Sequence, residues 1–142
     1  MPHALVDVDL VLESNSLFHK AGGEASIRKA LKHFYDRVFS DVMIGFFFAQ
    51  KNQEDKELLI QRELELASEI LKGPLLYQGH NLSGVHFPLR IFGGQFDRRT
   101  QILKECLTQA NFPQEVIDAW IQATESMRPL ITSNPKSVCK NP

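Results

Sequence analysis

The chain has 142 residues, 43% of them hydrophobic and 23% charged, which is the length and composition of one globular domain with one buried core. Its 16 basic and 17 acidic side chains give a formal net charge of -1, and this balance excludes the broad positive surface that nucleic acids or acidic membranes require. We therefore expect neither a nucleic-acid partner nor a membrane partner.

Residues 1–16 are predicted to be an extension that precedes the folded domain. They carry Asp7, Asp9 and Glu13, whereas a secretory signal peptide is basic at its start and then apolar. No apolar run in the chain approaches the roughly 20 residues that a membrane-spanning helix needs. We expect a cytoplasmic protein.

The first helices are predicted on either side of a glycine pair at residues 22–23. Apolar residues favour a short helix over residues 17–21. Over residues 24–39, large apolar residues recur at three- and four-residue steps, the period of one buried helix face. This stripe comprises Ile27, Leu31, Phe34, Tyr35, Val38 and Phe39. After a stop at Ser40-Asp41, three phenylalanines at 46–48 fall in a short connection, and such a cluster needs something large to pack against.

A second long helix is predicted from Glu54 to Lys72, a stretch rich in good helix formers that Gly73-Pro74 closes. Its apolar residues are too numerous for one narrow face, so the sequence defines which residues face the core only to within one position. From Leu75 to Gly94, glycines and prolines interrupt short apolar groups, which predicts a loop with one or two helical turns near residues 81–87. An irregular segment of this length in a small domain is usually functional.

Two further helices are predicted over Phe96–Ala110 and Pro113–Leu130, with Pro113 at the first helical position. The chain shows no internal repeat and only weak strand signals, so the predicted fold class is all-α. We expect one domain over residues 17–132 and a flexible tail over residues 133–142.

The chain contains few of the residue motifs that metal binding or hydrolysis requires. None of its five histidines pairs with another at the helical spacing, with carboxylates, that a multi-ligand metal centre uses. Cys106 and Cys139 lack the number and spacing of a disulfide scaffold, so we expect free thiols. Nucleophile-elbow and phosphate-binding glycine motifs are missing. His86 stands out because apolar residues frame it within the irregular segment, although a histidine in such a setting is more often structural.

Several motifs in order make the chain resemble a truncated (two-over-two) globin, most closely the first group of that family. The resemblance runs over residues 18–131. Its motifs are Gly22-Gly23, Phe34-Tyr35-Asp36-Arg37-Val38, Phe47-Phe48, Leu71-Lys72-Gly73-Pro74 followed by Tyr77 and Gly79, His86, and Phe96-Asp97. Lys72 departs from the family, which carries a glycine there. The resemblance implies a globin-like two-over-two helical sandwich with a short N-terminal helix.

The resemblance implies that His86 is the proximal ligand of haem b. A neutral imidazole nitrogen suits this role, because it leaves ferrous haem iron one open coordination position. The resemblance also implies that Tyr35 is a distal tyrosine whose hydroxyl donates a hydrogen bond to a bound gas. It further implies that Phe48 stacks against the porphyrin.

Counting back from Gly73 aligns the second long helix with the family, although a few extra residues precede this helix. The alignment places residues 59 and 63 on the distal side and residues 62, 66 and 67 toward the haem: Leu59, Glu63, Arg62, Leu66 and Ala67. Arg62 is then expected to pair with a haem propionate. Glu63 stands where many relatives carry glutamine, and a buried carboxylate is costly without a partner. Glu63 is therefore either an unusual feature of the pocket or a sign that the register is wrong.

The irregular segment is expected to supply the remaining cofactor contacts. Leu89 and Ile91 are expected to bind the cofactor, and Tyr77 and Arg90 are secondary candidates for the propionate edge. Charged and phenolic side chains near a loop are, however, more often simply solvated.

The expected function is reversible binding of O2, NO or CO at ferrous haem. The resemblance also implies reaction of O2 with NO to give nitrate, which requires a reductase partner, so the question of an enzymatic activity stays open. One alternative is haem-based sensing or electron transfer, in which His33 or a side chain of the second long helix closes the sixth iron site. Another is a globin scaffold that has lost haem and serves as a binding module.

Overall fold

The structure is a computed structural model that describes residues 15–79, 81–86 and 89–133. Its elements are α2 (Leu17–Lys20), α3 (Gly23–Ser40), the 3-10 helix η1 (Gly45–Phe48), α4 (Gln53–Ile70), α5 (Leu82–His86), α6 (Gly93–Gln109), α7 (Gln114–Ser126) and α8 (Arg128–Ile131). These described ranges contain no strand, which confirms the all-α prediction. Most of the predicted extension, nearly all of the predicted tail, and Phe87-Pro88 lie outside the described residues. No helix in the described part is long and apolar enough to cross a membrane.

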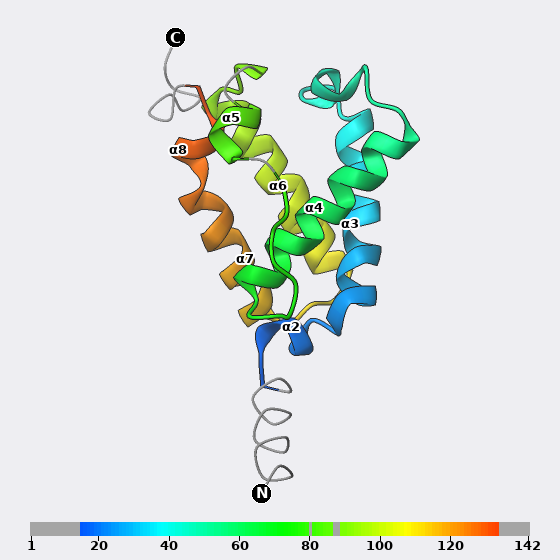
Figure 1. The fold of residues 1–142 in the computed structure, drawn as a ribbon, viewed down its shortest axis with the longest axis vertical. Coiled ribbons are helices and arrows are strands. Elements are labelled where there is room, and N and C mark those ends of the chain that lie inside the picture. Colours follow the sequence, from blue (N-terminus) through cyan, green and yellow to red (C-terminus); the bar gives the residue numbers. More distant parts are fainter. Residues whose placement is uncertain (1–14, 80, 87–88, 134–142) are drawn as a thin grey trace, which may run out of the picture.

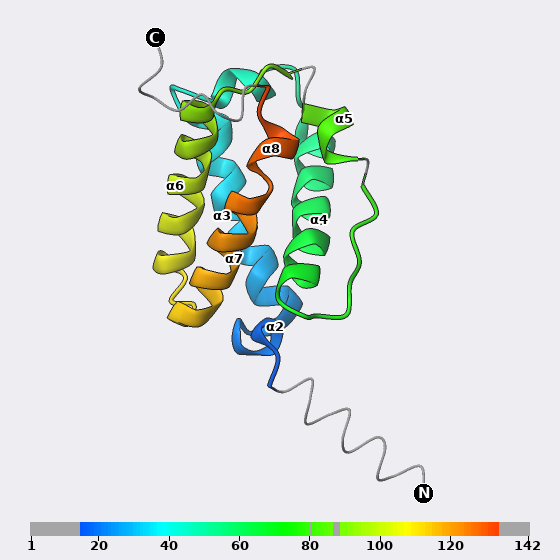
Figure 2. The same cartoon turned by 90° about the vertical axis from the view of Figure 1, so that its left-hand side faces the viewer.

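The four long helices form two antiparallel pairs, α3 with α4 and α6 with α7 (Figures 1 and 2). α3 also packs against α6, and α4 packs against α7. The two pairs therefore enclose one interior, as a two-over-two sandwich requires. The short elements η1, α5 and α8 gather at the end of the sandwich where α3 finishes and α4 and α6 begin (Figure 1).

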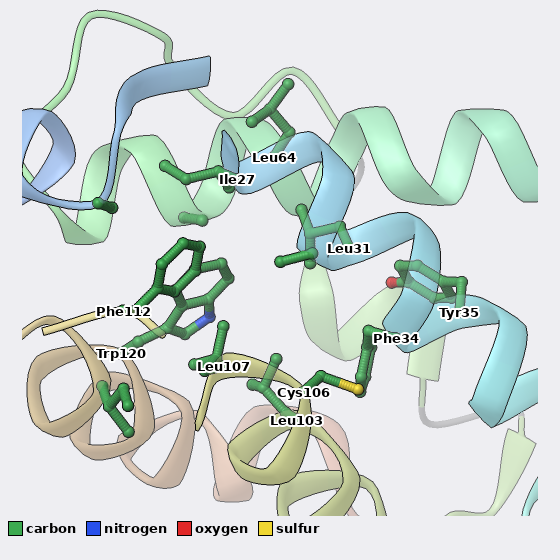
Figure 3. Close-up of a cluster of buried hydrophobic side chains, with 14 of the residues drawn as sticks. Ile27, Leu31, Phe34, Tyr35, Leu64, Leu103, Cys106, Leu107, Phe112 and Trp120 are labelled. Atoms are coloured by element: carbon green, nitrogen blue, oxygen red, sulfur yellow. The ribbon is translucent and has the colours of Figure 1, made fainter. Parts of the chain in front are cut away.

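The apolar stripe of α3 forms the centre of the core. Leu31 and Phe34 are fully buried there, against Leu103 and Leu107 of α6 and Trp120 of α7 (Figure 3). In the same view the cluster extends from Trp120 at one end to Tyr35 at the other. The three- and four-residue period of the sequence thus places one face of α3 in contact with the second helix pair.

Residues in the left-handed conformation stand at ends of the long helices: Gly22 before α3, Lys72 after α4 and Asn111 after α6. Gly22 precedes α3 at φ 94°, and a Cβ there would lie 2.8 Å from the Cβ of Ser26. Lys72 follows α4 at φ 63°. The Gly73 N–H donates to the Ser68 carbonyl at 2.7 Å, which together with the Lys72 conformation completes a Schellman cap. A glycine at position 72 would adopt this φ without the strain, of about 1 kcal/mol, that a side chain adds.

The last predicted helix, Pro113–Leu130, is wrong as a single element. The structure divides it at Met127 into α7 and α8, and Pro113 precedes α7 as its N-cap. Pro129 explains the division, because it has no N–H to continue the ladder and disfavours helical backbone in the residue before it. The Met127 N–H accordingly donates to the Thr124 carbonyl, one residue short of the α-helical partner.

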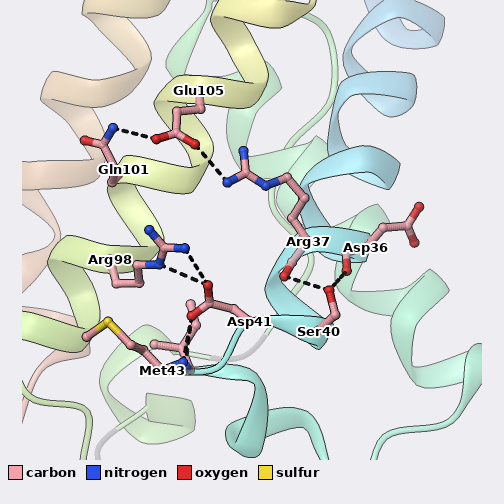
Figure 4. Close-up of polar contacts among 9 residues, drawn as sticks. Asp36, Arg37, Ser40, Asp41, Met43, Arg98, Gln101 and Glu105 are labelled. Atoms are coloured by element: carbon pink, nitrogen blue, oxygen red, sulfur yellow. Dashed lines mark hydrogen bonds and ion pairs between the residues drawn. The ribbon is translucent and has the colours of Figure 1, made fainter.

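Asp41 fixes the junction between α3 and η1 (Figure 4). Its Oδ2 accepts hydrogen bonds from the Met43 N–H at 2.9 Å and the Ile44 N–H at 3.2 Å. Its Oδ1 accepts from the Arg98 Nη2 at 2.7 Å. The Arg98 guanidinium and these backbone N–H groups hold the pKa of the Asp41 carboxyl below its usual range. One carboxylate thus joins the end of α3 to both η1 and α6.

Asp41→Asn is expected to lower the free energy of unfolding at neutral pH by about 2 kcal/mol, because hydrogen bonds to a charged group are lost. Since the pKa of Asp41 is lowered in the folded protein, its contribution is complete above the unfolded-state pKa of about 3.9 and is lost as the pH falls through the folded-state pKa. Urea unfolding at decreasing pH measures this. The difference between the two proteins should shrink in acid, and a difference that stays constant would contradict the assignment. Glu24→Gln, at an exposed ion pair, is the control.

Candidate functional site

A cavity of about 230 Å³ lies between the helix pairs, at the end of the sandwich where the short elements gather. Its walls are mostly apolar and come from every helix except α2. The lining residues are Val38, Ile44, Phe47, Phe48, Lys51, Leu59, Glu63, Leu66, Ile70, Leu82, His86, Leu89, Ile91, Gln95, Phe96, Arg99, Thr124, Met127 and Ile131. An apolar cavity with a few polar groups is the usual form of a small-molecule or cofactor site.

His86, the last residue of α5, is the one histidine that lines this cavity among the described residues. Its Nδ1 lies 2.8 Å from the Leu82 carbonyl oxygen and donates a hydrogen bond to it. The lone pair of Nε2 is therefore available for a ligand bond. Burial lowers the pKa of the imidazole below its ordinary value, which favours the neutral form that binds metals. The residues present thus fit a centre that needs one nitrogen ligand, and the described residues hold no cluster of three or more metal-ligating groups.

A charged pair crosses the cavity wall from α4 to α6. The Arg99 Nη2 lies 2.9 Å from the Glu63 Oε1, and the two side chains are 23% and 11% exposed. The Arg99 guanidinium also lies over the Phe34 ring, 5.0 Å from its centroid. Glu63 therefore has the partner that a carboxylate needs in such a place. Its position on the cavity wall agrees with the register expected from Gly73.

Tyr35 lies beside this charged pair, although it is not among the residues that line the cavity. The side chain is buried, and its ring meets the Phe34 ring edge-on at 5.0 Å. Burial, and next the negative charge of Glu63, raise the pKa of the hydroxyl above its ordinary value; a hydrogen bond from Arg99 acts in the opposite direction. The Tyr35 hydroxyl, Arg99 and Glu63 form one polar group between α3, α4 and α6.

The aromatic connection between α3 and α4 supplies one apolar wall. Phe48 lines the cavity and stacks on Phe39, with ring centroids 4.8 Å apart and an interplanar angle of 20°. Phe47 lines the cavity as well, whereas Phe46 is largely exposed. The connection thus presents flat rings to the cavity.

The structure brings together many of the residues that the resemblance assigns to the site. The cavity lining includes Phe48, Leu59, Glu63, Leu66, His86, Leu89 and Ile91. Arg99 and Lys51 also line it and were not predicted. Arg99 is three residues after Phe96 and four before Leu103, so it continues the inward stripe of its helix, and a charge on that stripe was the signal available.

Four other predicted residues, besides Tyr35, lie away from the lining: Arg62, Ala67, Tyr77 and the exposed Arg90. Arg62 pairs with Glu65 at 3.0 Å, Ala67 is fully buried in the core, and Tyr77 is half-buried in the segment after α4. Burial acts to raise the pKa of the Glu65 carboxyl, but hydrogen bonds from Gln61, the Gln78 N–H and Arg62 hold it below its ordinary value. Arg62 is therefore bound by a carboxylate of its own helix and not by a group in the cavity.

The chain is similar in sequence and fold to known proteins. Residues 16–133 match the model of the family described as bacterial-like globin. A group 1 truncated hemoglobin of Tetrahymena thermophila is 24% identical over 113 residues, which cover 80% of this chain and 91% of that protein. The Fe(III) form of the truncated hemoglobin of Tetrahymena pyriformis superposes with a TM-score of 0.75 at 23% identity, over 83% of this chain and 98% of the other.

A second solved structure shares the fold. The 2/2 hemoglobin of a Synechococcus species, in the cyanomet state and with covalently attached heme, superposes with a TM-score of 0.72 at 22% identity, over 84% of this chain and 96% of the other. These likenesses confirm the resemblance to truncated globins that the motifs indicate. The chain therefore belongs to the bacterial-like globin family, as a truncated haemoglobin of group I.

Proposed function

We propose that this globin holds haem b in the cavity with His86 as the protein ligand, and that it binds a diatomic gas reversibly. The observation that carries the proposal is His86, a half-buried imidazole on the cavity wall with its Nδ1 occupied by the Leu82 carbonyl. Haem would supply the ferrous iron at which O2, NO or CO binds. The protein supplies the ligand, the shape of the site and its electrostatics.

The apolar wall is suited to a flat macrocycle. We assign Phe48, Leu66, Leu89 and Ile91 to its faces and edge, since all four line the cavity. These side chains would exclude water from the haem. Ala67, which is fully buried in the core, is assigned to the packing that holds α4 in place.

The propionate edge needs cations or hydrogen-bond donors. Lys51 lines the cavity and is exposed to solvent on one side, so we assign it to a propionate. Arg62 and Tyr77 remain secondary proposals for this edge, and Arg62 would have to exchange its bond with Glu65.

We assign Leu59, Glu63 and Tyr35 to the distal side. Leu59 gives an apolar contact, and the Tyr35 hydroxyl donates a hydrogen bond to the gas. Such a bond favours a ligand that carries partial negative charge, as O2 does, and slows its escape. The same shielded site suits conversion of NO and O2 to nitrate, with a separate reductase as the partner.

The described residues do not favour either alternative: Glu63, a side chain of α4 on the cavity wall, is already bound to Arg99. His33 is exposed on α3 and its Nε2 lies 3.2 Å from the Gln109 Oε1, so it does not line the cavity. A scaffold that had lost its cofactor is expected to fill the space with larger side chains, because empty interior volume is destabilising.

Titration of the purified apoprotein with haemin tests the proposal. We expect a Soret band that saturates at one haem per chain, and a shift of that band when the reduced protein takes up CO. A five-coordinate ferrous spectrum before CO addition would favour gas binding over a closed sixth site. Absence of a Soret band at saturating haemin would overturn the proposal.

A further inference from the structure

Arg99 is a charged residue on a helix face that otherwise faces the interior. It projects from α6 between Phe96 and Leu103, both of which are fully buried. Its guanidinium contacts the Glu63 carboxylate at 2.9 Å and the face of the Phe34 ring at 5.0 Å. An apolar side chain would fill this position at lower cost, because burying ions removes hydration that their attraction only partly replaces.

The contacts of Arg99 reach both α4 and α3. Glu63 comes from α4, while Phe34 and Tyr35 are neighbours on α3. Burial acts to lower the pKa of Arg99, but the charge of Glu63 and then the interaction of the guanidinium with the Tyr35 hydroxyl raise it above its ordinary value. A guanidinium has a rigid fork of donors, so one Arg can hold a carboxylate and a phenolic oxygen at once.

This arrangement determines what the Tyr35 proton can do. When the phenolic oxygen accepts a hydrogen bond from Arg99, the hydroxyl keeps its single proton for another acceptor. Glu63 is the competing acceptor nearby, and its bond to Arg99 occupies Oε1. A hydroxyl that is itself an acceptor is also a stronger donor, since hydrogen bonds in a chain polarise one another.

We propose that Arg99 is a positioning residue of the distal site, which holds the Glu63 carboxylate and the Tyr35 oxygen so that the hydroxyl proton is directed to the gas ligand. The inference rests on the proposed function, because it requires haem in the cavity. It goes further by assigning to Arg99, acting through Tyr35, the preference of the site for O2 over CO, a ligand with little negative charge to accept a hydrogen bond.

A double-mutant cycle between Arg99 and Tyr35 tests this inference. It is made in a Glu63→Gln background, so that Arg99→Met leaves no unpaired carboxylate. O2 dissociation is followed by stopped-flow absorbance, and the CO stretching frequency by infrared spectroscopy. Arg99→Met is expected to raise the O2 dissociation rate about tenfold where Tyr35 is present, and less than about twofold in the Tyr35→Phe background. The ratio of these two fold-changes measures the coupling between Arg99 and Tyr35. The CO stretch should rise, because positive field near the ligand is lost.

Two further variants keep the test decisive. Arg98→Met is the matched control, because Arg98 is next to Arg99 in the chain but bonds Asp41 and does not line the cavity; it should alter stability and leave the O2 rate unchanged. Arg99→Lys keeps the charge and removes the fork, so it replaces Arg99→Met if that variant does not fold, with a smaller, still Tyr35-dependent rise. Equal changes in both Tyr35 backgrounds, or none, would overturn the inference. Failure of the unsubstituted protein to bind haem overturns the proposed function instead.

Discussion

The His86→Gly protein is expected to lose the Soret band of bound haem, and added imidazole is expected to restore it. Removing the ligand bond should weaken haem binding by at least about a hundredfold, equivalent to about 3 kcal/mol. The glycine leaves a space on the cavity wall that free imidazole can occupy, since the Leu82 carbonyl remains there to accept its N–H. Haemin titration with and without imidazole measures both effects.

His33→Gly is the matched control for this experiment, because it removes a histidine that is exposed on α3. It should bind haem as the unsubstituted protein does. If His86→Gly binds haem with unchanged affinity and an unchanged spectrum, another residue is the iron ligand and the assignment of His86 is wrong.

Tyr35→Phe is expected to leave haem binding intact and to raise the O2 dissociation rate about thirtyfold. This factor corresponds to the loss of one hydrogen bond to a partly negative oxygen, which is worth about 2 kcal/mol. The ring stays in place against Phe34, so the core should not change. CO accepts such a bond poorly, and its dissociation should change by less than about twofold. Stopped-flow displacement of each gas provides the rates.

Ser40→Ala is the control for the loss of a hydroxyl, because Ser40 does not line the cavity and its Oγ donates to the Asp36 and Arg37 carbonyls at the end of α3. Its O2 dissociation rate should equal that of the unsubstituted protein. If the Tyr35→Phe protein also has the O2 dissociation rate of the unsubstituted protein, the Tyr35 hydroxyl does not reach the gas.

The long helices could be predicted from the sequence because the patterns that indicate a helix are local. The period of apolar residues in α3, and the composition and Gly-Pro closure of α4, depend on neighbours in the chain. The division of α7 from α8 is not evident from the apolar pattern, because that pattern continues past Pro129. The backbone restriction that proline imposes is what ends the helix there. The short helix α5 was placed correctly, near residues 81–87.

The site was predictable only in part, because its polar contacts join residues far apart in the chain. Counting from Gly73 placed Leu59 and Glu63 on the cavity wall, since one helix fixes the relative positions of its residues. Arg99 was missed because nothing near Glu63 in the sequence identifies a partner on α6. The propionate role expected for Arg62 competes with its ion pair to Glu65 within α4, which the i,i+3 spacing of the two residues favours.

The central claim is that His86 binds iron from the wall of this cavity. A crystal structure of the haem-loaded protein, with iron located by its anomalous scattering, tests it most directly. We expect one iron per chain, within bonding distance of the His86 Nε2 and between α4 and α6. An iron peak bonded to another residue, or a haem outside a cavity that side chains have filled, would contradict the account.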